Sequence, residues 1–300
     1  GLWVALELSE LSSLLDSPRK GERRSLAKLL TEIERGQKIE LPHEEPWILG
    51  VTGAPGVGKS TLIGRMISHW HSNGEKVAVL AVDPSSPISG GSLMADRVRM
   101  PHSDSSDSVY VRSLASQNFP GGILPHIDTM CRALSACGWH RIIIETVGSG
   151  QSEISIVAFS DVVLLVEGPD RGDIIQAEKA GVLEIADAIV INKSDIPSSA
   201  SALEDIRRSL ELSEDDNRVV RSVSAINGDG ITELISEIEN IEKDPSRSRI
   251  RNRERLISHW VSLLITHERI ESNLEKLSNG SITINDAIDS IGNSLNFGGN

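Results

Sequence analysis

Gly53-Ala54-Pro55-Gly56-Val57-Gly58-Lys59-Ser60-Thr61 is the stretch that decides the fold of this 300-residue chain. It follows the apolar run Trp47–Val51 and precedes the run Leu62–Ile67, so the expected order is strand, glycine-rich loop, helix. The spacing G-x-x-x-x-G-K-S in that context is typical of a phosphate-binding P-loop. The glycines allow successive backbone N–H groups to point at one centre, to which the helix adds the positive end of its dipole. An ordinary glycine turn before a lysine would not explain all of these positions together, so the sequence predicts a nucleoside-triphosphate site.

Two side chains of this loop have expected roles in the chemistry. Lys59 is expected to reach the β- and γ-phosphates and to carry charge during phosphoryl transfer. The Ser60 hydroxyl is expected to bind Mg²⁺, the cation that accompanies the phosphates.

A second motif, Asn192-Lys193-Ser194-Asp195, follows a hydrophobic run. Asp195 is expected to accept hydrogen bonds from the N1–H and the exocyclic amine of guanine, while Asn192 and the stem of Lys193 shape the base pocket. Adenine lacks this pair of donors, so the unpaired carboxylate would penalise ATP. Alone the tetrapeptide could be a common polar turn, but it stands about 130 residues after the P-loop and before Ser224-Ala225. The sequence therefore predicts guanine rather than adenine.

A third group of residues is expected near the γ-phosphate. Glu145 and Gly148 follow the expected strand at residues 141–144; the carboxylate is predicted to hold Mg²⁺ through a water, and the Gly148 N–H to meet the γ-phosphate. A helix-capping acid is the alternative for Glu145. Asp83 and Asp96 are further candidates for the Mg²⁺ shell, although Asp83 could equally cap a turn.

Four other polar residues could take part without the spacing requiring it. Arg97 and Arg99 could contact phosphate or stabilise charge in the transition state, and an exposed surface position explains them equally well. Gln151 and Ser152 could orient the attacking water.

Composition limits the classes of partner and compartment. The net charge of −13 and a pI near 5.1 argue against binding to nucleic acid or to anionic membranes, because phosphates would be repelled. The cysteines, Cys131 and Cys137, fit neither a disulfide framework nor a zinc site. No apolar run approaches 18 residues, and no secretory signal is visible. We expect a soluble, cytoplasmic protein.

The alternation of apolar runs and amphipathic stretches predicts an α/β fold with a doubly wound, mostly parallel sheet. Helical extensions are expected on both sides of this P-loop NTPase domain: 1–45 before it, 46–245 for the domain itself, and 246–300 after it. The first extension should contain two helices broken at Ser17-Pro18. The last has an apolar pattern over residues 250–277, which suits either a helix packed back on the domain or a dimerisation arm. Strands are expected at 47–51, 77–82, 109–112, 141–144, 161–167, 187–191 and 218–223, and core helices at 123–137, 174–185, 202–210 and 231–241.

These residues resemble the MeaB/ArgK-type P-loop GTPases, which escort adenosylcobalamin-dependent acyl-CoA mutases such as methylmalonyl-CoA mutase. The resemblance covers about residues 20–240. The matching stretches, several of them more specific than the P-loop, are Arg24–Lys28, Gly53–Thr61, Val82–Pro87, Ser89–Ser92, Asp96–Met100, Glu145–Gly148, Gly150–Glu153, Gly172-Asp173, Gln176, Lys179, Gly181, Glu184, Ala186-Asp187 and Asn192–Asp195.

The resemblance implies a homodimeric GTPase whose switch loops couple GTP and GDP to a mutase and its cobalamin. It implies Mg²⁺ contacts for Ser60, Asp83, Asp96 and Glu145, and a partner-sensing switch around residues 172–179. The chain departs from the family pattern at Ser149 and in the loops 117–120 and 169–171.

The first hypothesis is therefore a slow GTPase that gates the loading or protection of a cobalamin mutase. A GTP-dependent metal-insertion chaperone is the alternative within the same class, although the sequence has no cluster of Cys and His. A P-loop kinase, or a nucleotide-binding scaffold that does not hydrolyse GTP, would also contain such a phosphate-binding loop.

Overall fold

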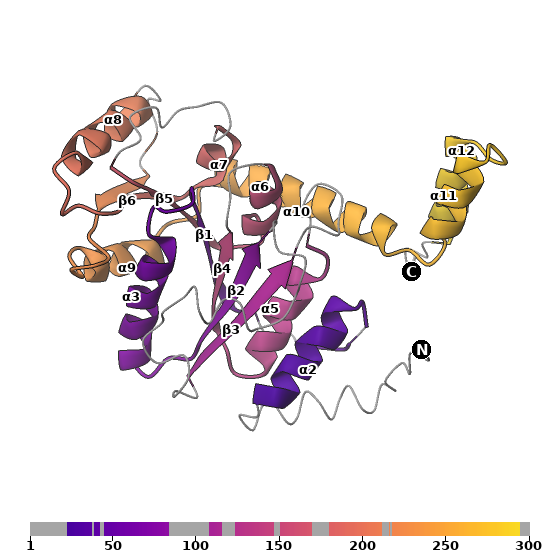
Figure 1. The fold of residues 1–300 in the computed structure, drawn as a ribbon, viewed down its shortest axis with the longest axis horizontal. Coiled ribbons are helices and arrows are strands. Elements are labelled where there is room, and N and C mark those ends of the chain that lie inside the picture. The colour runs from indigo at the N-terminus through magenta and orange to yellow at the C-terminus, as the bar shows by residue number, and fades with distance from the viewer. Residues whose placement is uncertain are drawn as a thin grey trace.

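A computed structural model describes residues 23–37, 39–42, 45–83, 108–115, 124–146, 151–169, 180–211, 216 and 218–294, with the backbone alone at 83, 151–152, 180, 209 and 211. A seven-stranded sheet with the order β3-β2-β4-β1-β5-β6-β7 forms the centre of the molecule (Figure 1). All six pairs of neighbouring strands are parallel, which confirms the predicted fold class. The strands are β1 (Trp47–Thr52), β2 (Val77–Asp83), β3 (Val109–Ala115), β4 (Arg141–Thr146), β5 (Val162–Glu167), β6 (Ala188–Ile191) and β7 (Val219–Ser222).

Helices cover both faces of this sheet, because alternate residues of each strand point to opposite sides. Leu49 of β1 and Leu164 of β5 pack on the side of α3 (Lys59–Ser72) and α9 (Ile231–Glu239). Their sequence neighbours Ile48 and Val163 pack on the other side. That side is covered by α2 (Arg23–Glu34), α5 (Ile127–Ala136), α6 (Gln151–Val157), α7 (Ala180–Ile185) and α8 (Ser199–Glu211). Burial on both faces explains why the strands read as continuous apolar runs.

Two of the boundaries that differ from those expected have a local cause in the backbone. Strand β3 runs on to Ala115, beyond the predicted end at residue 112, because it pairs with β2 along the whole length of both strands. Helix α5 begins at Ile127 instead of residue 123, because His126 before it has a left-handed backbone (φ 66°) that does not continue a helix.

The amino-terminal extension contributes α2 to the core. The four apolar residues that form its predicted stripe are all buried: Leu26, Leu29, Leu30 and Ile33. They belong to the same apolar cluster as Met130 of α5. The helix ends before Gly36, whose φ of +86° is left-handed and suits glycine. The helix predicted before Pro18 lies outside the described residues.

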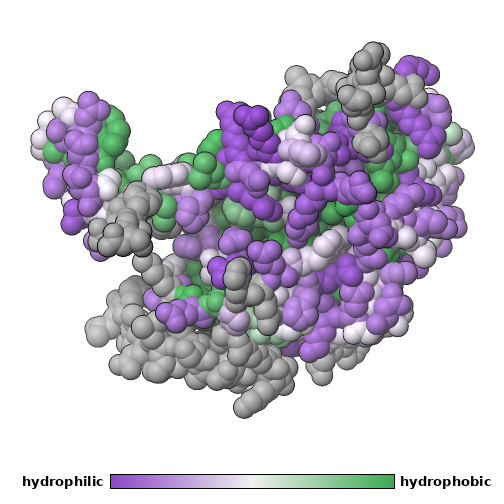
Figure 2. Space-filling model, turned by 180° about the vertical axis from the view of Figure 1, so that it is seen from behind, coloured by the Kyte–Doolittle hydropathy of each residue, from purple (hydrophilic) through white to green (hydrophobic). Residues whose placement is uncertain are grey.

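The carboxy-terminal part forms three helices, α10 (Pro245–Ile265), α11 (Ile270–Ser278) and α12 (Ile284–Gly292). Helix α10 begins earlier than the predicted residue 250, because the Asp244 carboxylate accepts hydrogen bonds from the N–H groups of Ser246 and Arg247. Its far end and the α11–α12 pair extend away from the sheet (Figure 1). Apolar side chains lie exposed along this extension, which we call the arm, residues 256–294 (Figure 2).

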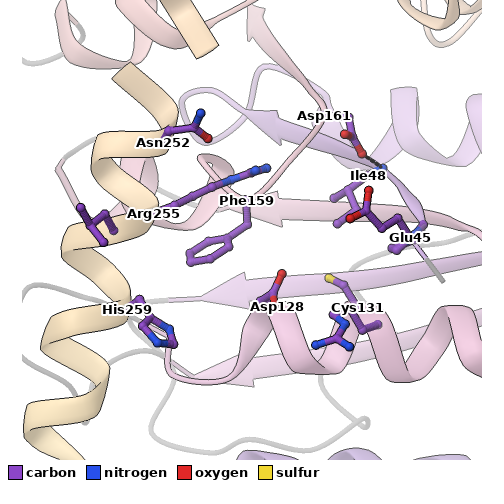
Figure 3. A pocket seen from close by; sticks show the side chains of 12 residues that line it. Glu45, Ile48, Asp128, Cys131, Phe159, Asp161, Asn252, Arg255 and His259 are labelled. Carbon is purple, nitrogen blue, oxygen red and sulfur yellow. Dashed lines mark hydrogen bonds between the residues drawn. The ribbon is translucent and has the colours of Figure 1, made fainter. Parts of the chain in front are cut away.

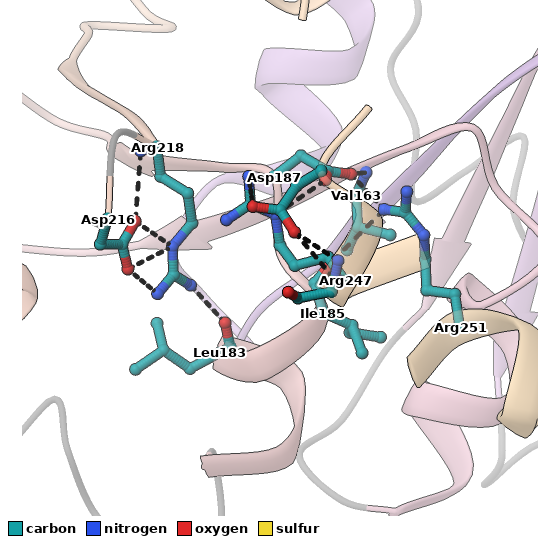
Figure 4. Close-up of polar contacts among 10 residues, drawn as sticks. Val163, Leu183, Ile185, Asp187, Asp216, Arg218, Arg247 and Arg251 are labelled. Atoms are coloured by element: carbon teal, nitrogen blue, oxygen red, sulfur yellow. Dashed lines mark hydrogen bonds and ion pairs between the residues drawn. The ribbon is translucent and has the colours of Figure 1, made fainter. Parts of the chain in front are cut away.

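A buried carboxylate anchors the beginning of α10 to the body. Asp187, which precedes β6, is 2% exposed and accepts a hydrogen bond from the Val163 N–H at 2.9 Å. Arg251, which is 4% exposed, forms an ion pair with the same carboxylate, and Arg247 lies 3.3 Å from its other oxygen (Figure 4). One turn of α10 is thus fixed to the amino ends of two neighbouring strands.

Arg255 makes the next contact along the same face of α10. Its guanidinium donates to the carbonyls of Ala158 at 2.5 Å and Ser160 at 3.2 Å, beyond the end of α6. It borders a cavity of about 450 Å³ between α10, α5 and the amino ends of β1 and β5 (Figure 3). Arg255 and His259 of α10 and Asp128 of α5 project toward this space.

Two remaining sequence expectations concern helices and thiols. Within the described ranges, no helix combines the length and the apolar character needed to cross a bilayer. Cys131 and Cys137 are both buried thiols.

Candidate functional site

The glycine-rich loop connects β1 to α3 at the carboxyl edge of the sheet. Gly53, Gly56 and Gly58 have φ values of +144°, +80° and +94°, which side chains with a Cβ rarely adopt. A Cβ on Gly53 would lie 2.1 Å from the Val166 carbonyl oxygen of β5. A Cβ on Gly58 would lie 2.3 Å from Nδ2 of Asn192. The loop therefore needs glycine both for its curvature and for its close approach to the neighbouring strand and turn.

Lys59 lies at the start of α3 and is 6% exposed. Its ammonium group donates to the carbonyls of Gly53 at 2.6 Å and Ala54 at 3.0 Å, so the side chain folds back across the loop. The backbone conformation of Gly58 places the first turn of α3 directly after the loop, where Leu62 N–H donates to the Gly58 carbonyl at 3.0 Å. A cation and a helix amino terminus therefore share one small region, which favours phosphate.

Glu145 meets Ser60 beside this loop. The Ser60 hydroxyl donates to Oε1 of Glu145 at 3.1 Å, which joins α3 to the carboxyl end of β4. Glu145 is 1% exposed, and burial raises the pKa of its carboxyl, although Lys59 and the hydrogen bond from Ser60 oppose the rise. Oε2 is buried with no hydrogen-bond partner among the described residues. A hydroxyl and a half-satisfied carboxylate are oxygen donors of the kind that Mg²⁺ takes, so these residues fit the ion.

The other residues predicted near the phosphates are only partly described. Asp83 ends β2, next to β4, and its side chain lies outside the described residues. Asp96, Gly148 and the whole segment 171–179 also lie outside them, as do Arg97, Arg99, Ser149 and residues 117–120. Gln151 and Ser152 begin α6, and only their backbone is described.

The predicted base motif is joined to both neighbouring loops. Asn192 Nδ2 donates to the Val57 carbonyl of the P-loop at 2.9 Å, and its Oδ1 accepts from the Ala225 N–H at 3.0 Å. The Ser224 hydroxyl donates to Asp195 Oδ1 at 2.6 Å, and this hydrogen bond is the main cause that lowers the pKa of the Asp195 carboxyl. Asp195 is therefore held as an ionised acceptor. The motifs after β1, β6 and β7 thus form one connected edge, and the Lys193 backbone between them is left-handed (φ 64°).

Two residues at this edge were missed by the sequence reasoning. Glu153 of α6 is 4% exposed and accepts a hydrogen bond from the Thr52 hydroxyl, at the end of β1, at 3.2 Å. Arg65 of α3 donates to the Ala225 carbonyl at 2.8 Å and to the Ile226 carbonyl. Glu153 lies in the first turn of α6, a helix that was not predicted from the sequence. No local signal pairs Arg65 with a loop 160 residues away.

Several known proteins are similar to this chain in sequence. A relative from Pyrococcus abyssi is 34% identical over 288 residues, which cover 91% of this chain and 85% of the relative. The mouse protein named methylmalonic aciduria type A homolog, mitochondrial, is 32% identical over 284 residues, covering 88% of this chain and 67% of its own length. The GTPase ArgK of Escherichia coli is 38% identical over 189 residues, or 59% of this chain and 57% of its own.

A solved structure and a protein family extend the comparison to fold and class. The crystal structure of an LAO/AO transport system kinase covers 97% of this chain and 99% of its own, with a TM-score of 0.61 at 22% identity, and so supports the fold. The family described as methylmalonyl Co-A mutase-associated GTPase MeaB matches residues 18–278. Because this match spans most of the sequence and includes the loop, the acidic strand end and the base motif, the chain belongs to the MeaB family of GTPases.

Proposed function

We propose that GTP hydrolysis by this chain gates the loading or protection of an adenosylcobalamin-dependent acyl-CoA mutase of the methylmalonyl-CoA mutase type. The observation that carries the proposal is the match of residues 18–278 to a family described as associated with that mutase. The relative named for methylmalonic aciduria is consistent with it. The binding of guanine nucleotides follows from the same family.

In the proposed mechanism, Lys59 and the N–H groups of the loop bind the β- and γ-phosphates and carry the charge that develops as water attacks. The Lys59 ammonium already lies against the loop, where the Gly53 and Ala54 carbonyls hold it. Ser60 and Glu145 would hold Mg²⁺, with Asp83 and Asp96 as further candidates and Gly148 as the donor to the γ-phosphate. When bound, the ion would neutralise phosphate charge.

We propose that Asp195 selects guanine. Its Oδ1 is fixed by the Ser224 hydroxyl, and its pKa is lowered, so it presents an ionised acceptor to the N1–H and the exocyclic amine. The proposed base pocket consists of Asn192, Lys193, Asp195, Ser224 and Ala225, and the phosphate cradle of the loop 53–61.

We further propose that the chain consists of an amino-terminal extension at residues 1–45, a GTPase domain at 46–245 and a helical segment at 246–300. We propose that the chain forms a homodimer through the arm in this last segment. Helix α10 begins close to the second of these boundaries. Beyond it, Leu256, Trp260 and Leu264 lie one helical turn apart on α10 with exposures of 60%, 47% and 43%. An apolar stripe left open on an extended helix favours a second apolar surface as its partner.

The test measures phosphate release from Mg²⁺-GTP by the purified chain, alone and with candidate cobalamin mutases, together with direct binding of each mutase. We expect slow release that increases several-fold with one mutase and that disappears in Lys59→Ala. Asp195→Asn should lower the use of GTP while the phosphate site remains. Lys76→Ala, which removes a lysine before β2 at the opposite edge of the sheet, is the matched control and should behave as the unmodified protein. Intact basal hydrolysis with no response to any mutase and no binding would contradict the gating role.

A further inference from the structure

The loop after β7 is closed on itself by its own hydrogen bonds. The Ser224 N–H donates to the Asp229 carbonyl at 3.1 Å, and the Gly228 N–H returns to the Ser224 carbonyl at 2.7 Å. Gly228 has a φ of +90°, which permits the tight return. These bonds fix the shape of the loop. They do not fix its position relative to the P-loop, which must come from contacts outside it.

Arg65 supplies such a contact from α3. Its Nε donates to the Ala225 carbonyl at 2.8 Å and its Nη2 donates to the Ile226 carbonyl, so one guanidinium binds the carbonyls of two successive residues. The planar fork of arginine suits two acceptors at a fixed spacing, whereas a lysine ammonium would hold them as a point charge. The contact is therefore directional as well as attractive.

The Ala225 residue is held from both sides. Asn192 accepts from its N–H, and Arg65 donates to its carbonyl. Asn192 also donates to the Val57 carbonyl, and Arg65 lies on the helix that begins at Lys59. These three hydrogen bonds and the continuous chain from Val57 to Arg65 close a ring through the P-loop, the motif after β6, the loop after β7 and α3. Movement of any one segment would displace the others.

We propose that Arg65 is a positioning residue for guanine recognition, which it performs through the loop at residues 224–228 without touching the base. This inference rests on the proposed guanine site. Ser224 in that loop orients Asp195 through a 2.6 Å hydrogen bond. If the loop moves, the Asp195 carboxylate no longer faces the exocyclic amine of guanine at hydrogen-bond distance. Such bonds are lost within a few tenths of an ångström and with misalignment.

A purely structural brace would have a different signature. It would lower thermal stability, or weaken the binding of all nucleotides alike by loosening the whole site. A positioning role instead weakens the nucleotide that carries the exocyclic amine more than the one that lacks it. Guanosine and inosine diphosphates differ in that amine alone, so they form the decisive pair of probes.

The experiment measures the dissociation constants of GDP, IDP and ADP for the full chain and for Arg65→Ala, Arg65→Lys and Arg221→Ala. Arg221 lies on β7 and pairs with Glu237 of α9 at 2.7 Å, so its removal is a matched loss of a partly exposed arginine nearby. Arg65→Ala should weaken the binding of GDP about tenfold to a hundredfold, the range for losing hydrogen bonds to a charged group. IDP should weaken several-fold less, so the GDP preference over IDP narrows. Arg65→Lys should be intermediate, and Arg221→Ala should match the unmodified protein.

The measured affinities distinguish a failure of the Arg65 role from a failure of the proposed guanine site. If the unmodified protein prefers GDP but Arg65→Ala weakens GDP and IDP equally, or neither, the positioning role is wrong and the guanine site stands. If the unmodified protein does not prefer GDP to IDP and ADP, the guanine site itself is wrong. Melting of each nucleotide-free variant shows whether it is folded, and Arg65→Lys decides the matter if Arg65→Ala does not fold.

Discussion

At the scale of single residues, Glu145 is expected to lower the stability of the protein without nucleotide and to strengthen the binding of Mg²⁺. Burial raises its pKa above the ordinary value of 4.5, so at neutral pH the ionised carboxylate costs stability. A group with a raised folded pKa contributes stability below its unfolded pKa, and that contribution is lost as the pH rises through the folded pKa. We predict that Glu145→Gln melts about 2 °C higher than the unmodified protein without nucleotide at pH 7, and that the difference shrinks toward pH 4.

The same substitution should act in the opposite direction on chemistry. A neutral amide is a poorer ligand for Mg²⁺ than a carboxylate, so the Mg²⁺ concentration that half-saturates phosphate release should rise at least tenfold. Glu233→Gln, on the exposed first turn of α9, is the matched control. If Glu145→Gln melted lower at pH 7 and kept the same dependence on Mg²⁺, Glu145 would be a purely structural acid.

At the residue scale, the sequence places side chains best where a motif fixes its own geometry. The contacts of Lys59 within its loop and the pairing of Ser224 with Asp195 join residues that the motifs had already placed at one strand edge. The bonds of Arg65 and of Glu153 could not be predicted. Each depends on how a helix rotates against a distant strand, and a side chain one position away on either helix would point elsewhere.

At the scale of elements, the attachment of α10 depends on Arg251 and Asp187. Both side chains are almost fully buried, and removal of one partner leaves the other charge without compensation. We predict that Arg251→Ala lowers the free energy of unfolding by about 3 kcal/mol, the low end for a broken buried pair, because Arg247 remains beside Asp187. Chemical denaturation followed by far-UV circular dichroism measures this change.

The control is Arg253→Ala, an exposed position on the same helix, which should change stability by less than about 0.5 kcal/mol. Equal effects of the two substitutions would mean that the buried pair does not anchor α10. Helices α6 and α7 end beside α10, where Arg255 contacts the Ala158 carbonyl and Arg251 contacts the Ile185 carbonyl. Loss of the Arg251 side chain should therefore weaken the packing of α10 on α6 and α7 before it affects the P-loop.

Elements were predicted well where the apolar period was strong and less well at their ends. The stripe of α2 and the continuous apolar run of β5 identified both elements. The start of α10 required the cap at Asp244, whose signal was the following proline. Helix α12 lies in the predicted helical extension but beyond the apolar pattern at residues 250–277, although Thr283 and Asp286 form a capping box that the sequence displays. The apolar signal of this segment is weak because the segment is short and otherwise polar.

At the scale of the whole molecule, parallel strands followed from the alternation of strands and helices, but their order did not. The chain places β4 and β5 on either side of β1, although β2 and β3 precede them in sequence. That order depends on which crossover helix covers which face, a property of packing between distant segments. The carboxyl edge was still predictable as the place where the motifs meet, because parallel strands bring all their carboxyl ends to one side.

The arm raises the question of whether the molecule acts alone. Leu256, Trp260 and Leu264 on α10 are joined by exposed Ile284 and Ile288 on α12, at 63% and 60%, and apolar side chains are visible along the arm in Figure 2. Open apolar side chains concentrated on an extended segment would be costly for a monomer. We predict a dimer in analytical ultracentrifugation at micromolar concentration.

The double substitution Trp260→Glu with Leu264→Glu should convert this dimer into a monomer, because each charge would have to be buried in an apolar interface. Arg253→Glu, on the exposed side of α10 before the arm begins, should leave the dimer intact. The basal rate of GTP hydrolysis should survive in the monomer, because the arm contributes none of the side chains described around Lys59. A monomeric unmodified protein at tens of micromolar would contradict this role for the arm. A dimer that the double substitution leaves unchanged would instead place the interface on another surface.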